Sequence, residues 1–123
     1  MKIAVVDQDL LTRDFIVNVM MYSVNREVFA FEDAEGLKRY LAEKGAPHLV
    51  FSEMRLPGSS GIELLQFIKK EFPGTRFIAL SADPADETAA AEMGADAFLA
   101  KPFLLKDLFE IVQRFIVEDV SSS

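Results

Sequence analysis

The sequence contains no cysteine, which excludes two kinds of structure. Without thiols, neither a disulfide framework nor a thiolate metal site can form. A chain without cysteine suits a reducing compartment, so we expect a cytoplasmic protein. The single histidine, His48, has no metal-ligating companions around it, and we interpret it as structural or solvated.

Long apolar runs and an excess of basic residues are also missing. No apolar run approaches the roughly 20 residues that cross a bilayer, and the start, MKIAVVDQD, lacks the basic and hydrophobic regions of a secretory signal. We therefore expect neither export nor membrane contact. The net charge is -7, which argues against direct nucleic-acid binding because that affinity comes largely from basic groups that neutralise phosphates. Proteins or small ions are the expected partners.

The 123 residues, 50% of them hydrophobic, are enough for one globular domain with one core. We assign residues 1–120 to this domain and residues 121–123 to a tail or the start of a linker. Short apolar runs that predict strands alternate with segments of helical periodicity. The strands are expected at residues 2–7, 27–31, 48–53, 76–81 and 96–100.

The expected helices follow each strand. In the first, Leu11, Phe15 and Val19 recur at helical spacing. The others are expected at residues 32–43, 62–72, 84–94 and 104–118. Five strand-helix repeats with nearly apolar strands predict an α/β fold, a doubly wound parallel sheet with helices on both faces. Sites in such folds lie at the carboxyl ends of the strands, which here are closed by Asp7, Glu53, Ser81 and Lys101.

Four segments resemble the receiver domains of bacterial response regulators, in that family's order. VVDQD is similar to its paired-acid motif, PHLVFSEMRLPGSSG to its acceptor strand and Pro-Gly turn, FIALSAD to its hydroxyl strand, and DAFLAKPF to its aromatic and Lys-Pro segment. The resemblance implies a flavodoxin-like (βα)5 fold with strand order 2-1-3-4-5. It also implies a signalling module of a two-component or phosphorelay pathway, not an enzyme.

The resemblance assigns a role to each matching position. Asp7 would be the first acid of the pocket, Gln8 would replace the carboxylate most important for magnesium, and Glu53 would replace the phosphorylated Asp. The remaining assignments are the phosphoryl-contact and switch residues Ser81, Ala82, Phe98 and Lys101, the rim residues Arg55 and Asp83, and a cis peptide bond before Pro102.

The two departures from the family pattern predict an atypical receiver. Glu53 is one methylene longer than Asp, and a displacement of about 1 Å can cost on the order of 10²-fold in the rate of transfer. Magnesium would rest on Asp7, Glu53 and the Arg55 backbone carbonyl, so we expect no cofactor or weakly bound magnesium. Our hypothesis is phosphorylation-independent signalling, with Glu53 as a partial mimic of phospho-Asp.

The expected partners are a sensor kinase, a phosphotransfer protein or an output domain. The resemblance also implies a possible homodimer through the fourth helix, the fifth strand and the fifth helix. Two alternatives stay open: a receiver that is still weakly phosphorylated, and a haloacid-dehalogenase-like phosphatase that uses Asp7 and Asp9. Such phosphatases need an acidic pair on a strand after the Lys, whereas everything after Lys101 has the pattern of one helix. Asp9 also fits a helix N-cap.

Overall fold

A five-stranded parallel sheet forms the centre of the protein. The computed structural model describes residues 1–22 and 26–122. The spatial order of the strands is β2-β1-β3-β6-β7, and every neighbouring pair is parallel. Since β6 and β7 are the fourth and fifth strands of this sheet along the chain, the predicted order is confirmed. The strands are β1 (Lys2–Val6), β2 (Glu27–Phe31), β3 (Leu49–Glu53), β6 (Arg76–Ser81) and β7 (Ala97–Ala100).

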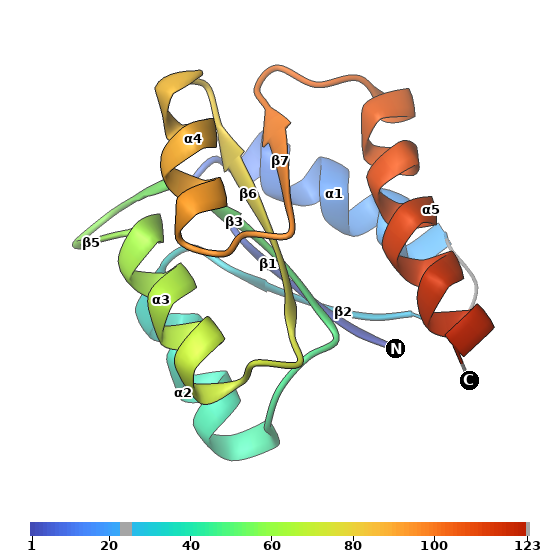
Figure 1. Ribbon diagram of the computed structural model, residues 1–123, viewed down its shortest axis with the longest axis horizontal. Coiled ribbons are helices and arrows are strands. Elements are labelled where there is room, and N and C mark those ends of the chain that lie inside the picture. The colour runs from blue at the N-terminus through green and yellow to red at the C-terminus, as the bar shows by residue number, and fades with distance from the viewer. Residues whose placement is uncertain (23–25, 123) are drawn as a thin grey trace.

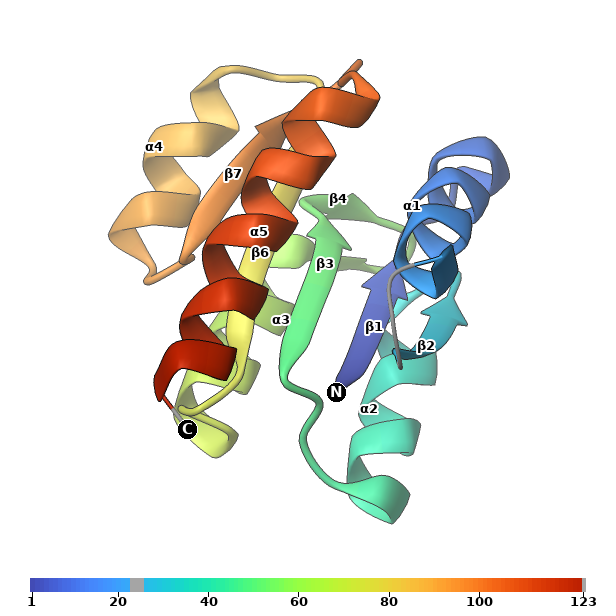
Figure 2. The ribbon, with the colours of Figure 1, turned by 90° about the vertical axis from the view of Figure 1, so that its right-hand side faces the viewer.

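Helices cover both faces of the sheet, as Figures 1 and 2 show. The helices α1 (Leu10–Tyr22) and α5 (Leu105–Ser122) lie on one face. The other face carries α2 (Ala34–Lys44), α3 (Gly61–Glu71) and α4 (Ala85–Glu92). The last helix extends beyond its expected end and includes residues 121 and 122 of the expected tail. Within the described part of the chain, no helix combines the length and apolarity needed to span a bilayer.

The core is divided by the sheet into two apolar clusters. Successive residues of a strand point to opposite faces, so Ala4 and Val6 pack under α2 and α3, whereas Ile3 and Val5 pack under α1 and α5. All four are fully buried. A strand buried on both faces needs apolar residues at successive positions, which explains the continuous apolar runs in the sequence.

The helix predicted from the spacing of Leu11, Phe15 and Val19 is present as α1, but other residues of it are the most buried. Ile16 and Met20 are the fully buried residues of this helix, whereas Leu11 is 80% exposed and Phe15 is also exposed. The segment LLTRDFIVNVMMY carries apolar residues on several faces, so more than one stripe has the spacing of an amphipathic helix.

A small hairpin that the sequence pattern does not predict follows Glu53 directly. Its strands are β4 (Arg55–Leu56) and β5 (Ser59–Ser60), which pair antiparallel around Pro57 and Gly58. Proline followed by a glycine with φ of +74° is the pattern of a type II turn. Ser60 then caps α3, because its hydroxyl accepts the Glu63 backbone N–H at 3.1 Å.

Gly61 brings the first turn of α3 against the end of β3. Its N–H donates to the Met54 carbonyl at 2.8 Å. A Cβ at this position would lie 2.5 Å from the Glu53 carbonyl oxygen and 2.9 Å from the Met54 carbonyl carbon. Only a residue without a side chain fits here, and the contact fixes the backbone that carries Glu53.

We expect Gly61→Ala to lower the free energy of unfolding by about 1–3 kcal/mol, because two backbone segments must separate to admit the methyl group. Gly74→Ala is the matched control, since a Cβ added at Gly74 would meet no atom within 4 Å, and it should change stability by less than about 0.5 kcal/mol. Urea unfolding measures both values. Equal stabilities of the two variants would contradict the close approach.

Candidate functional site

The sheet register gathers four polar side chains at one edge. Glu53 ends β3 and Ser81 ends β6, while Asp7 and Lys101 follow directly after β1 and β7. The Lys101 N–H donates to the Ser81 carbonyl at 2.8 Å, which extends the β6–β7 ladder by one step. All four residues therefore lie at the carboxyl edge, where parallel sheets place their ligand sites.

The Lys101 ammonium joins two buried carboxylates. Its Nζ donates to Asp7 Oδ2 at 2.6 Å and lies 2.6 Å from Glu53 Oε2. The second contact is an ion pair without hydrogen-bond alignment, since Oε2 has no hydrogen-bond partner. Asp7 is fully buried and Glu53 is 7% exposed. This trio is named the carboxylate pocket below.

Burial dominates the electrostatics of Glu53. Desolvation raises the pKa of the Glu53 carboxyl above its ordinary value, and the ammonium of Lys101 offsets this only in part. Burial by itself would lower the pKa of Lys101, but the hydrogen bond to Asp7 and the contact with Glu53 outweigh it, so that pKa is raised. The ammonium is therefore held firmly, with Asp7 as its better aligned partner and Glu53 as the weaker one.

Asp9 lies outside the carboxylate pocket and caps α1. Its carboxylate accepts the Thr12 hydroxyl at 2.7 Å and the Leu11 N–H at 3.2 Å. The hydrogen bond from Thr12 lowers the pKa of Asp9. The Asp9 N–H in turn donates to Asp7 Oδ1 at 2.9 Å. Of the two acids that a phosphatase would need, one is thus engaged as a helix cap.

A second polar cluster lies on the β6–α4 side. Ser81 Oγ donates to Asp86 Oδ2 at 2.6 Å, and Arg55 contacts the same carboxylate at 3.1 Å and 3.3 Å. Arg55 also pairs with Asp83 at 2.8 Å. The hydroxyl of Ser81 is thus bound to α4 and not to the carboxylate pocket. This group of Arg55, Ser81, Asp83 and Asp86 is named the α4 cluster.

The other residues assigned from the sequence take varied places. Gln8 is exposed and borders a cavity of about 500 Å³ shared with Arg55 and Asp86. Ala82 is exposed and borders a cavity of about 390 Å³ beside Lys101. Phe98 is half-buried and packs against the core under α4. The Lys101–Pro102 peptide bond is cis.

A magnesium ion fits these residues poorly. Magnesium prefers several oxygen ligands, including one or two carboxylates, but Asp7 and Glu53 both face the Lys101 ammonium. The residue after Asp7 offers only the neutral amide of Gln8. In residues 1–22 and 26–122, no group of three His, Cys, Asp or Glu residues is arranged to hold a metal ion.

Two contributing residues were missed in the sequence. Arg13 donates from Nη1 to the Asp7 carbonyl at 2.7 Å and ties α1 to the end of β1. Asp86 joins Ser81 to Arg55. An acid in the first turn of a helix is ordinarily explained by the helix dipole. The short spacing between Ser81 and Asp86, across a turn that contains Pro84, was the available signal for a contact.

Among protein-family models, the response regulator receiver domain matches this chain over residues 3–113. The transcriptional regulator NtrC of Azospirillum brasilense is 35% identical over 114 residues, which are 91% of this chain and 23% of that protein. The response regulator FleR of Pseudomonas aeruginosa is 28% identical over 99% of this chain and 26% of its own length. The chain thus spans about a quarter of these curated relatives.

Solved structures give the same result. The receiver domain of NtrX from Brucella abortus superposes with a TM-score of 0.85 at 28% identity, over 94% of this chain and 98% of that one. The receiver domain of DrrB, activated with beryllium fluoride, superposes with a TM-score of 0.83 at 31% identity, over 94% of this chain and 97% of that one.

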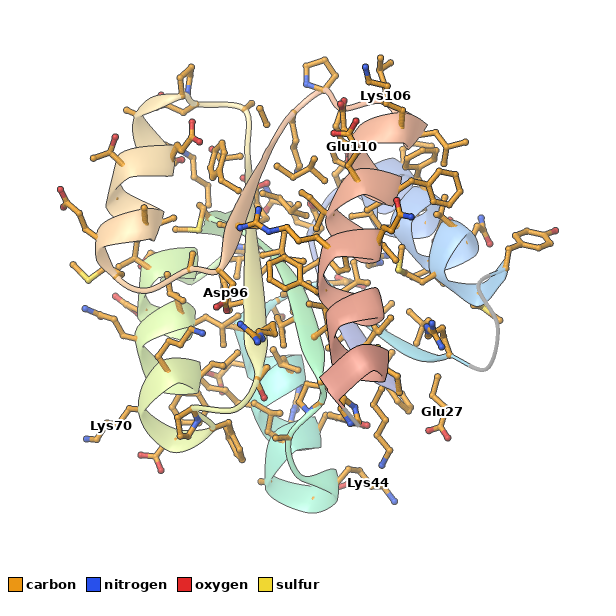
Figure 3. All side chains as sticks on the ribbon, turned by 45° about the vertical axis from the view of Figure 1, so that its right-hand side comes forward. Glu27, Lys44, Lys70, Asp96, Lys106 and Glu110 are labelled. Atoms are coloured by element: carbon orange, nitrogen blue, oxygen red, sulfur yellow. The ribbon has the colours of Figure 1, made fainter. Side chains whose placement is uncertain are left out.

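We expect Lys101→Met to lower the free energy of unfolding by about 3–5 kcal/mol at neutral pH, because it leaves two buried carboxylates without their cation. Lys106→Met is the matched control: this lysine is exposed at the start of α5, where Figure 3 labels it, and its loss should cost less than about 0.5 kcal/mol. Urea unfolding measures both. A Lys101 variant as stable as the Lys106 variant would show that the carboxylate pocket has little energetic weight.

The raised pKa of Glu53 predicts the sign of a pH dependence. A carboxyl whose pKa is higher in the folded state contributes stability below its unfolded pKa and loses it as pH rises through the folded pKa. The stability of the unmodified protein relative to Glu53→Gln should therefore fall as pH rises from below the ordinary value of 4.5 through the raised pKa. Urea unfolding of both proteins at several pH values gives this difference. The opposite slope would mean that the Lys101 ion pair outweighs the burial of Glu53.

Proposed function

Because this chain belongs to the response regulator receiver domain family, we propose that it serves two-component or phosphorelay signalling without being phosphorylated. Receiver domains are signalling modules, and they interact with kinases, phosphotransfer proteins and output domains. The observation that carries the finer proposal is the buried contact of 2.6 Å between Glu53 and the Lys101 ammonium. In this proposal Glu53 stands at the phosphoacceptor position, and its carboxylate is already paired with the ammonium that it shares with Asp7.

The geometry around Glu53 works against phosphoryl transfer in three ways. Its side chain is one methylene too long for in-line attack at the position of an Asp. Its ammonium partner is shared with Asp7 and is not free to meet an incoming phosphoryl group. Gln8 supplies no charge to a divalent cation, and transfer depends on such a cation to neutralise the developing charge. We therefore infer low magnesium affinity and no productive transfer.

Glu53 is an imperfect mimic of a phosphorylated Asp. A carboxylate carries about one negative charge, compared with roughly 1.5 to 2 for a phosphoryl group, and it lacks the tetrahedral oxygens. What the mimic reproduces is the ion pair to Lys101. In this proposal the charges of Asp7, Glu53 and Lys101 do not change during signalling. The signal then depends on which partner is bound.

Partners are proposed to bind the face of α4, β7 and α5. This face contains a cavity of about 300 Å³ bordered by Ala90, Ala91, Phe98 and Ile111. A second copy of the chain is one candidate for this face. The curated relatives are about four times longer than this chain, so an output domain in the same protein is the other. We also propose a cytoplasmic setting, and that any contact with DNA would come from another segment of such a protein.

The phosphatase alternative is disfavoured by the engagement of Asp9 as the cap of α1. Its further requirement, an acidic pair on a strand after the lysine, also finds no support. Beyond Lys101, the described residues form a short loop followed by α5.

A phosphodonor experiment tests the proposal. After incubation with acetyl phosphate and magnesium, intact-protein mass spectrometry should show no added phosphoryl group on the unmodified protein. The double variant Gln8→Asp/Glu53→Asp restores both acids of the family pattern and should gain one phosphoryl group under the same conditions. Stable incorporation into the unmodified protein at Glu53 would refute phosphorylation-independence and leave the weakly phosphorylated receiver as the better description.

A further inference from the structure

We propose that Asp86 is a positioning residue that holds the Ser81 hydroxyl on α4 and away from the carboxylate pocket. This inference rests on the proposed function for its significance, because the family resemblance makes Ser81 the group that would meet a phosphoryl ligand. The contacts that carry it lie outside the carboxylate pocket. They are the hydrogen bonds of Ser81 and the double contact of Arg55 with Asp86.

The hydrogen of the Ser81 hydroxyl is committed to Asp86. A serine hydroxyl has one hydrogen to donate and two lone pairs that accept. Ser81 Oγ donates to Asp86 Oδ2 at 2.6 Å and accepts the Asp83 N–H at 3.0 Å. While this bond is present, the hydroxyl cannot donate to Glu53 or to an anion in the carboxylate pocket. Ser81 is 1% exposed and the Asp86 side chain is 19% exposed, so the bond is partly shielded from competition by water.

Arg55 fixes the carboxylate that receives this hydrogen. Its Nε lies 3.1 Å from Asp86 Oδ2 and its Nη2 lies 3.3 Å from Oδ1, a two-point contact that sets the orientation of the carboxylate. The guanidinium side chain is 63% exposed, so the ion pair alone is weak. The role of Arg55 is to orient the Asp86 carboxylate toward the Ser81 hydroxyl. Because Arg55 follows Glu53 by two residues, it also links the end of β3 to α4.

The α4 cluster holds the first turn of α4 against the end of β6 and the β4–β5 hairpin. This helix buries only one of its side chains, Ala90, so apolar packing anchors it lightly. Asp86 lies in its first turn, where a negative charge is favoured by the helix dipole. Any event that draws the Ser81 hydroxyl toward the carboxylate pocket must first break its bond to Asp86. The state of the pocket is thereby coupled to the position of α4.

Amide hydrogen exchange of α4, measured without any phosphodonor, tests the inference. Asp86→Ala and Ser81→Ala should each speed exchange of the α4 amides by about tenfold, the change expected from loss of one hydrogen bond to a charged group. The double variant should exchange more slowly than the product of the two single effects predicts, because both changes remove the bond between Ser81 and Asp86, although Ser81→Ala also removes the acceptor of the Asp83 N–H. Glu87→Gln removes a charge from the same turn and should change the rate less than Asp86→Ala does, because it removes only the interaction with the helix dipole.

Asp86→Asn separates positioning from a simple charge effect at the helix start. Asparagine keeps an oxygen that accepts from Ser81, so its exchange rate should lie closer to the unmodified protein than that of Asp86→Ala. A rate for Asp86→Ala equal to that of Glu87→Gln, additive effects of Ser81→Ala and Asp86→Ala, or equal rates for the Asn and Ala variants would overturn the inference. Phosphorylation of the unmodified protein would refute the proposed function and leave these outcomes unaffected.

Discussion

The arrangement of the carboxyl edge depends on one ammonium group that two buried carboxylates share. Asp7 and Lys101 are 94 residues apart in the chain, yet their charged atoms lie 2.6 Å apart. The contact exists only when β1, β3 and β7 occupy their places in one parallel sheet. Replacing such a buried ion group by apolar residues is often neutral or stabilising, whereas removing one member leaves a charge uncompensated. The ion group of Lys101, Asp7 and Glu53 therefore contributes by specifying the relative positions of the ends of β7, β1 and β3.

A second polar cluster borders the first without sharing its side-chain contacts. Ser81 lies between them: its backbone carbonyl binds the Lys101 N–H, while its hydroxyl binds Asp86. The backbone of one residue thus belongs to the sheet edge that supports the carboxylate pocket, and its side chain belongs to α4. Arg55 approaches Asp86 from the hairpin that begins just after Glu53. The sheet is tightly packed, whereas α4 buries only Ala90. The polar contacts between the sheet edge and Asp86 are therefore important for holding α4 in place.

The strands and the polar strand ends were predictable because their signals are local. A run such as Leu49, Val50 and Phe51 identifies a strand buried on both faces, and the residue that closes it identifies the edge. The spacing in α1 predicts a helix but not which of its residues are buried, since Leu11 and Ile16 lie on different faces with similar apolar character, and only packing selects between them. The hairpin β4–β5 has two residues per strand, too few for any periodicity. The contact between Asp86 and Ser81 depends on how the turn before α4 orients the first residues of that helix. Sequence spacing alone does not determine this orientation.

Charge gives a reason for the pocket to resist an anion that is independent of its geometry. The two carboxylates and one ammonium of the carboxylate pocket leave one net negative formal charge in a buried space. A phosphoryl group on Glu53 would replace one unit of charge with roughly 1.5 to 2, and the excess would face Asp7 at low dielectric. A divalent cation would remove this penalty. However, Gln8 provides no carboxylate ligand for it, and the carboxylates of Asp7 and Glu53 are already paired with Lys101. Side-chain length and charge therefore act in the same direction, and both support the proposal of a receiver that signals without being phosphorylated.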